Sequence, residues 1–423
     1  MALELERDFR ELEQLLAQVA IPRGVRIEQR FTPRAPLGDM REAVHRALAG
    51  IDLPRGSVAV GVGSRGVARI GEMVAALVAE LKEAGAQPFI VPAMGSHGAS
   101  TAAGQAEVLA HLGVSEASCG APVRATMDVV EIGRTLAGLP VYMDANAHAA
   151  DAIVVVSRVK PHTAFRGPIE SGPCKMIAIG LGKQRGAHVL HAAGWERFHE
   201  TVPQAATVGI AGGKIAFALA TIENERDEPF HLEAVPAREL LAREPALLEL
   251  AKKSLARLPF EKLDVLVIDR IGKNVSGDGA DPNVTGRYPT PYGGGGPHIE
   301  RLVFLDLTDE TLGNANGIGL ADVVTQRLAE RFSPAATYPN ALTSTVSETV
   351  RMPMTLPNPR LALAAALMMV PGLESSRGRV VRILDTMHLS DMWVSEPLLA
   401  EVEAHPALRL AGELGEFPLP AWA

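Results

Sequence analysis

SVAVGVG, residues 57–63 of a chain of 423 residues, is the stretch that decides the fold. The run is apolar and rich in valine, so it predicts a buried strand. Apolar residues then recur at helical spacing over residues 72–84 until Gly85, and a second apolar run, PFIVPA, follows at 88–93. A strand, a helix and a strand in this order predict two parallel strands joined by a crossover helix.

The same alternation continues along the first half of the chain. We expect a second helix at 103–112 and further strands around Val129 and at 152–156, where the sequence reads AIVVV. Repeated strand–helix alternation is typical of a doubly wound α/β sheet. We therefore predict a first α/β domain over residues 1–260, built on a mostly parallel sheet.

A second α/β domain is expected over residues 261–423. Its strands are predicted at 263–269, 301–307 and 380–385, and its helices at 320–332 and 361–369. We expect the active site to lie in the cleft between the two domains, because such clefts are common ligand sites.

Composition narrows the class of function. The chain has 41 Lys and Arg against 49 Asp and Glu, a net charge of −8, which argues against a nucleic-acid binder. Its longest apolar run, residues 361–370, is too short to span a membrane, and the first residues show no apolar signal-peptide core. Only two cysteines occur, Cys119 and Cys174, which favours a reducing cytoplasm. We therefore expect a cytoplasmic protein that acts on a small molecule.

A polar loop follows each of three expected strands. These loops are GSRG (63–66), MGSHG (94–98) and SRVKPH (157–162). Because the carboxyl ends of parallel strands line one crevice, Arg65, His97 and His162 are expected to converge on one pocket. An isolated loop arginine is more often a surface ion-pair partner, whereas a histidine between glycines has few apolar packing partners and favours a functional role.

Two further polar segments accompany these loops. Residues 157–199 carry additional basic side chains between apolar runs, among them Lys175, His188 and His191. Residues 272–283 form a loop rich in turn-forming and polar residues. A glycine run at 293–296 is interpreted as a flexible loop rather than a phosphate cradle, because no strand-to-helix phosphate motif surrounds it. From the residues alone, the prediction is a two-domain α/β enzyme with a His/His/Lys cleft.

Four features together make the chain resemble the lactate racemase family of nickel-pincer-nucleotide enzymes. They are Gly95-Ser96-His97-Gly98, the segment from His162 to Lys175 with its Ser171-Gly172-Pro173-Cys174-Lys175 end, His191 sixteen residues after the lysine, and the turn with Asp281 and Asn283.

The resemblance implies roles for individual residues. Lys175 would carry the cofactor, a nickel pyridinium-3,5-bisthiocarboxylic acid mononucleotide derivative, as a thioamide. His191 would complete a square-planar nickel site, with His188 as the alternative ligand, and His97 and His162 would be the paired acid/base residues. The implied activity is racemisation or epimerisation of a 2-hydroxy acid, with cofactor-biosynthesis enzymes as partners.

Departures from the family pattern suggest a substrate other than lactate. Val62 stands where the lactate enzymes carry an aspartate, and Gly286 and Pro289 stand where they carry glutamine and lysine. The segment between His162 and Lys175 is also slightly longer. The side chains expected to bind the substrate are Arg65, Lys273, Asn274 and Arg287.

Two other classes of function compete with this reading. His97 and His162, with His188 or His191, could form a three-histidine zinc site for hydrolysis. Alternatively, the chain could be a binding protein that keeps the fold without the cofactor.

Overall fold

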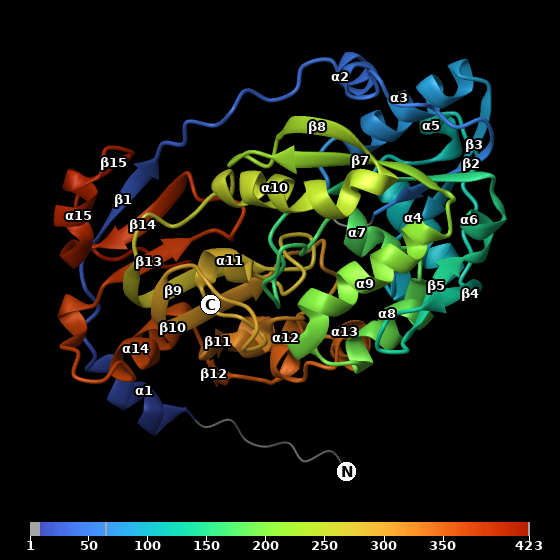
Figure 1. Ribbon diagram of the computed structural model, residues 1–423. Helices are drawn as coiled ribbons and strands as arrows, with labels where there is room; N and C mark the ends of the chain where they lie inside the picture. The colour runs from blue at the N-terminus through green and yellow to red at the C-terminus, as the bar shows by residue number, and fades with distance from the viewer. Residues whose placement is uncertain (1–8, 64–65, 422–423) are drawn as a thin grey trace, which may run out of the picture.

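A central five-stranded sheet organises the first domain (Figure 1). The computed structural model describes residues 9–63 and 66–421. In spatial order the strands are β3 (Ala86–Pro92), β2 (Gly56–Val62), β6 (Ala152–Arg158), β7 (Ile215–Glu223) and β8 (Pro229–Pro236). All neighbours are parallel except β8, which pairs antiparallel with β7 at the edge. The predicted parallel sheet is confirmed.

Helices cover both faces of this sheet. They are α2 (Met40–Ala47), α3 (Ile70–Glu83), α4 (Ala102–His111), α5 (Glu116–Cys119), α6 (Ala145–Ala149), α7 (Pro173–Lys175), α8 (Lys183–Ala192), α9 (Phe198–Ala211) and α10 (Leu240–Lys253). Alternate residues of β6 show the two layers. Val154 belongs to the apolar core with α2 and α3, and Val155 belongs to the core with α9 and α10. The doubly wound arrangement follows, because both faces of each strand are buried.

The expected strand around Val129 lies outside the central sheet. It is β4 (Val129–Arg134), which pairs only with β5 (Pro140–Asp144) in a separate antiparallel hairpin. The side chains of β4 are largely accessible, which a central strand's would not be.

The second domain contains an eight-stranded mixed sheet. In spatial order its strands are β12 (Met354–Leu356), β11 (Val323–Thr325), β10 (His298–Leu307), β9 (Lys262–Ile271), β13 (Val380–Ile383), β14 (Asp391–Ser395), β1 (Gly24–Gln29) and β15 (Leu408–Leu410). Its helices are α1 (Arg10–Ala17), α11 (Pro282–Thr285), α12 (Gln326–Arg331), α13 (Pro334–Ser344), α14 (Pro359–Met368) and α15 (Leu399–Ala404).

One predicted helix of this domain is partly wrong. Residues 320–332 were expected to be helical throughout, but 323–325 form β11, and the helix α12 begins at Gln326. The β-branched triplet VVT pairs in parallel with β10 and is fully buried, so tertiary pairing overrides the helical pattern.

The N-terminal segment requires a correction to the predicted first domain of residues 1–260. β1 pairs with β14 and β15 in the sheet of the second domain, and its Ile27 is fully buried there. The chain therefore begins in the second domain, crosses to α2 and returns near residue 260; Figure 1 shows the crossing in blue. Sequence periodicity did not show this, because β1 and β14 lie more than three hundred residues apart.

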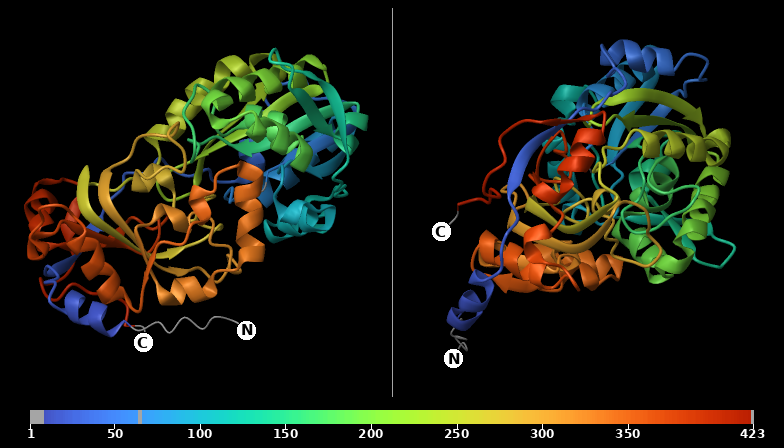
Figure 2. Two further views of the ribbon diagram at one scale, coloured as in Figure 1. Left: turned by 90° about the horizontal axis from the view of Figure 1, so that it is seen from below. Right: turned by 90° about the vertical axis from the view of Figure 1, so that its left-hand side faces the viewer.

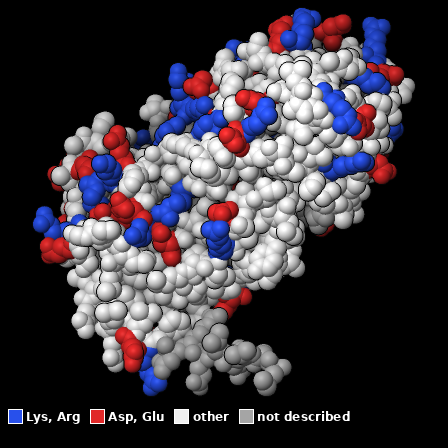
Figure 3. Space-filling view, turned by 60° about the horizontal axis from the view of Figure 1, so that its bottom comes forward, with Lys and Arg blue, Asp and Glu red and all other residues white. Residues whose placement is uncertain are grey.

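The two domains form two lobes in contact (Figure 2). On the face drawn in Figure 3, side chains of both charge signs are interspersed, without a continuous basic region. Among the described residues, every helix falls short of the length and apolar content needed to cross a bilayer.

Candidate active site

A cavity of about 210 Å³ lies where the two domains meet. Its first-domain wall is formed after the carboxyl ends of β2, β3 and β6, where the strand order reverses around β2. The second domain closes it with polar side chains: Lys273, Asp278, Asn316, Asn340, Thr343, Ser344 and Thr349. This is the position expected for a ligand site in an open α/β sheet.

The loop after β3 carries His97 into this cavity. Gly95 and Gly98 flank it with φ of 59° and 65°, in the left-handed region that favours glycine. A Cβ at Gly98 would lie 2.6 Å from the backbone nitrogen of Gln105, so the loop lies directly against α4. The glycines therefore hold His97 at the cavity wall in a turn that other residues would strain.

His162, from the loop after β6, contacts Lys175 on α7. The Lys175 Nζ lies 2.6 Å from His162 Nε2, and both side chains line the cavity. On the other side of the ring, Nδ1 of His162 accepts a hydrogen bond of 3.0 Å from the backbone N–H of Ala164. A neutral imidazole that accepts at Nδ1 carries its proton on Nε2. In that tautomer the Lys175 nitrogen would accept this hydrogen bond, as a neutral amine can.

His191, on α8, faces the same cavity with a defined ring orientation. Its Nδ1 lies 2.6 Å from the carbonyl oxygen of Ala187, so Nδ1 carries the proton and Nε2 is the nitrogen with a lone pair. Trp195 packs between the two histidines, with its ring centroid 5.2 Å from that of His191 and 5.9 Å from that of His162.

A buried carboxyl group anchors the short helix that carries Lys175. Glu244 of α10 is 1% exposed, and it accepts a 2.8 Å hydrogen bond from the backbone N–H of Cys174. Burial raises the pKa of Glu244 to about 7, and the bonds from Cys174 oppose that rise. Burial also raises the pKa of the Cys174 thiol, which therefore stays a thiol rather than a nucleophilic thiolate.

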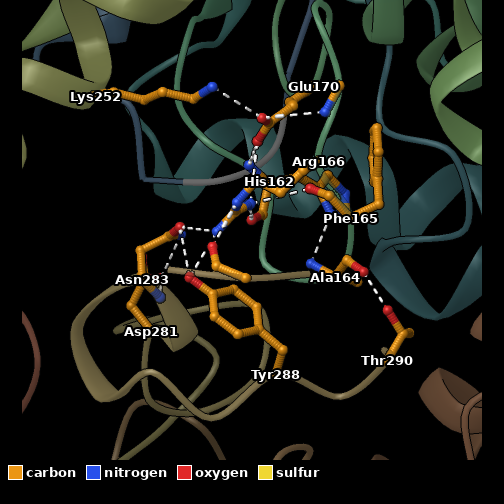
Figure 4. A network of polar contacts seen from close by, with 12 residues as sticks. His162, Ala164, Phe165, Arg166, Glu170, Lys252, Asp281, Asn283, Tyr288 and Thr290 are labelled. Atoms are coloured by element: carbon orange, nitrogen blue, oxygen red, sulfur yellow. Dashed lines mark hydrogen bonds and ion pairs between the residues drawn. The ribbon is translucent and has the colours of Figure 1, made fainter. Parts of the chain in front are cut away.

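Arg166 joins the His162 loop to the second domain (Figure 4). Its Nη1 donates to the carbonyl oxygen of His162 at 2.6 Å. Its Nη2 donates to Asn283 Oδ1 and to the Tyr288 hydroxyl, each at 2.6 Å. Its Nε donates to the carbonyl oxygen of Gly294 at 2.8 Å, so the glycine run at 293–296 supplies one acceptor to this guanidinium. The Asp281 turn adds an ion pair with Lys160 at 3.6 Å.

Comparison with known proteins matches this part of the chain to a family. Residues 60–200 match the family model described as lactate racemase N-terminal domain. This match covers about a third of the chain and shows what that part is similar to. That range contains His97, His162, Lys175 and His191, so the resemblance seen in the sequence is confirmed.

A solved structure extends the likeness to the whole fold. The lactate racemase apoprotein from Thermoanaerobacterium thermosaccharolyticum superimposes with a TM-score of 0.50 at 12% identity, over 84% of this chain and 93% of that chain. The predicted two-domain α/β fold is thereby confirmed. No curated protein matches the sequence.

The first domain brings together four of the side chains singled out in the sequence, and the second domain adds one. His97, His162, Lys175 and His191 line the cavity, and Lys273 reaches it from the second domain. His188 is exposed on α8 and does not line the cavity, so His191 is the better-placed ligand of the two. Arg65 lies outside the residues that the structure describes.

Two residues predicted to bind the substrate lie outside this cavity. Asn274 is exposed, and its Oδ1 accepts a 2.6 Å hydrogen bond from Thr308. Arg287 is held by Asp322 at 3.0 Å and donates to main-chain carbonyls of the second domain. Neither lines the cavity, because loop conformation determines where their side chains point.

The three-histidine zinc site receives no support from the geometry. Within residues 9–63 and 66–421, no three His, Cys, Asp or Glu side chains are grouped so that they could hold a metal ion.

Trp195 lines the cavity, but the sequence did not predict it as a site residue. Helical spacing from His191 gave no signal for it, because α8 ends at Ala192 and Gly194 takes a φ of 92°.

The buried Glu244 makes a testable prediction about stability. Its pKa is raised from an ordinary 4.5 to about 7, so its stabilising contribution is fully present below about pH 4.5 and is lost as the pH rises through about 7. Glu244→Gln keeps the shape and cannot ionise. The free energy of unfolding of the wild type should therefore fall relative to this variant across that window, by roughly 3 kcal/mol. Urea unfolding at a series of pH values measures the difference, and two parallel curves would refute the ionisation of Glu244.

Proposed function

We propose that this protein is a racemase or epimerase of a 2-hydroxy acid that works with a nickel-pincer nucleotide. The observation that carries the proposal is the grouping of Lys175, His162 and His191 in one interdomain cavity that His97 also lines. Membership of the N-terminal domain in the lactate racemase family supports a racemase-type reaction.

The residues present fit the cofactor. A lysine forms a covalent bond to an acyl or thioacyl group through its neutral amine, the form in which Lys175 can accept a hydrogen bond from His162 Nε2. His191 has the arrangement of a metal ligand, because Nδ1–H bonded to a backbone carbonyl fixes the ring and leaves Nε2 for the metal. Lys175 would thus hold the nucleotide and His191 the nickel. When bound, the cofactor would accept and return a hydride at the substrate carbon.

The two remaining histidines supply acid/base chemistry. Removing a hydride from a hydroxy acid requires that the hydroxyl proton leaves at the same time, and returning it requires the proton back. Imidazole titrates near neutral pH, so it can perform both transfers. His97 and His162 enter the cavity from the separate loops after β3 and β6, so each is assigned to one enantiomer.

The second-domain side of the cavity offers polar groups to a substrate. Lys273 offers a cation for a carboxylate or hydroxyl group, and the amide and hydroxyl side chains around it come from the second domain. We propose a 2-hydroxy acid that is larger or more polar than lactate, such as a sugar acid. The assignment rests on Lys273 and its neighbours in the cavity wall, because Asn274 and Arg287 do not line this cavity.

The first prediction from this proposal concerns a covalent adduct. Protein produced together with the cofactor-biosynthesis enzymes should gain the mass of the nucleotide on Lys175 and should contain nickel. Intact mass, peptide mapping and metal analysis measure this. Lys175→Ala should remain unmodified and poor in nickel, whereas Lys160→Ala, which removes another lysine of the same cavity, should still be modified.

Other outcomes of this measurement identify the competing functions. Bound zinc without a covalent adduct would support the alternative of a three-histidine zinc hydrolase. Neither metal nor adduct would support a cofactor-free binding protein.

The second prediction concerns the paired histidines. His97→Ala and His162→Ala should each lower the racemisation rate per bound nickel by about 10²- to 10⁴-fold, the usual loss for a positioned acid/base. The double variant should be little slower than either single one, because the two act as a unit. His188→Ala, on the exposed face of α8, is the matched control and should keep the wild-type rate. Activity that merely follows nickel content would contradict the acid/base roles.

The third prediction concerns the substrate. In a panel of 2-hydroxy acids followed by loss of optical purity, lactate should react poorly and acids with additional hydroxyl groups should react well. Polar groups of the wall that lactate leaves unpaired cost about 1–3 kcal/mol each. Lactate as the best substrate of the panel would overturn this assignment.

A further inference from the structure

A fully buried lysine lies behind the cavity, next to the loop that carries His97. Lys183 is the first residue of α8, and its side chain has no exposed surface. It forms an ion pair of 2.9 Å with Asp144, whose side chain is equally buried. The backbone at Lys183 has φ of 54°, a conformation that few residues other than glycine adopt. A buried charge in an unusual backbone conformation indicates a position that its surroundings determine closely.

Lys183 fixes the orientation of a second buried side chain. Its Nζ donates to Gln105 Oε1 at 3.0 Å and also to the carbonyl oxygen of Pro92, at the end of β3. Gln105, on α4, has no exposed surface. An amide can present either end to a partner, but a cation can only donate. The oxygen of Gln105 must therefore face Lys183, and its NH₂ group must face the opposite way.

The NH₂ group of Gln105 faces the loop that carries His97. Nε2 donates to the carbonyl oxygen of Gly95 at 2.8 Å and to that of His97 at 3.2 Å. These two carbonyls belong to the left-handed glycine and to the histidine itself. Asp144 thus orients Lys183, Lys183 orients Gln105, and Gln105 holds the backbone on both sides of Ser96.

We propose that Gln105, oriented by the buried Lys183–Asp144 pair, is a positioning residue that sets where the His97 imidazole lies in the cavity. Lys183 also begins the helix that carries His191, so the same pair ties the His97 loop to the proposed metal ligand. The proposal rests on the proposed acid/base function of His97. Gln105 contacts no cavity surface, so its effect passes through the loop.

Two variants separate hydrogen bonding from packing. Gln105→Met keeps the length of the side chain and removes its donors and acceptor. Gln105→Glu keeps the shape and the bond from Lys183 but cannot donate to Gly95 and His97 when ionised, so it covers the case in which the first variant does not fold. Glu107→Met, on the exposed face of the same helix, is the matched control.

The first readout is kinetic. In the nickel-loaded enzyme, both Gln105 variants should lower kcat by about 10²-fold, the effect of an ångström-scale misplacement of a reacting group, with KM and nickel content unchanged. Glu107→Met should behave as the wild type. A change in KM alone, or a wild-type kcat in a folded Gln105 variant, would overturn the proposal.

The second readout does not depend on racemase activity. Diethyl pyrocarbonate modifies histidines, and peptide mass spectrometry gives the rates at His97 and His162 in the same sample. The His97:His162 ratio should rise several-fold in both Gln105 variants and stay constant in Glu107→Met. An unchanged ratio would overturn the positioning role. A changed ratio in a protein that racemises nothing would uphold it and refute the proposed function instead.

Discussion

The contact between Lys175 and His162 is the interaction on which the rest of the site depends. It joins the loop after β6 to the helix α7, and it makes the hydrogen-bond roles of both side chains mutually dependent. The backbone at or next to each of these two residues is held by a buried glutamate. Glu170, fully buried, accepts from the N–H of His162, and Glu244 accepts from the N–H of Cys174. These contacts fix the position of the amine to which the proposed function assigns the covalent bond.

Arg166 links the second domain to the loop that carries His162. Arg166 bonds to the carbonyl oxygen of His162 and to Asn283 and Tyr288 across the domain boundary. The charge-assisted bonds of a guanidinium are strong and directional, so the position of the second domain and the orientation of the His162 loop are linked. This gives the turn with Asp281 and Asn283 a physical role at the domain interface.

The sequence predicted the centre of the site better than its periphery. His97 and His162 were placed together because parallel strands open their loops at one edge, a rule that depends only on strand order. The sequence could not show that Asn274 and Arg287 lie outside the cavity, because neighbours distant in sequence, Thr308 and Asp322, determine their directions. The membership of β1 in the second sheet was missed for the same reason. Gln105 was indistinguishable from any other helical glutamine until the loop packed against it.

The most direct test of this account is the ionisation of the Lys175 amine in the protein without cofactor. Trace labelling with acetic anhydride between pH 6 and 11, read by peptide mass spectrometry, compares Lys175 with the exposed Lys253. Lys253 should gain reactivity about tenfold per pH unit until it approaches the ordinary lysine value of about 10.4. The account predicts that Lys175 is already reactive at pH 7 and gains little above it. Parallel curves for the two lysines would contradict it, because Lys175 would then be an ordinary ammonium group.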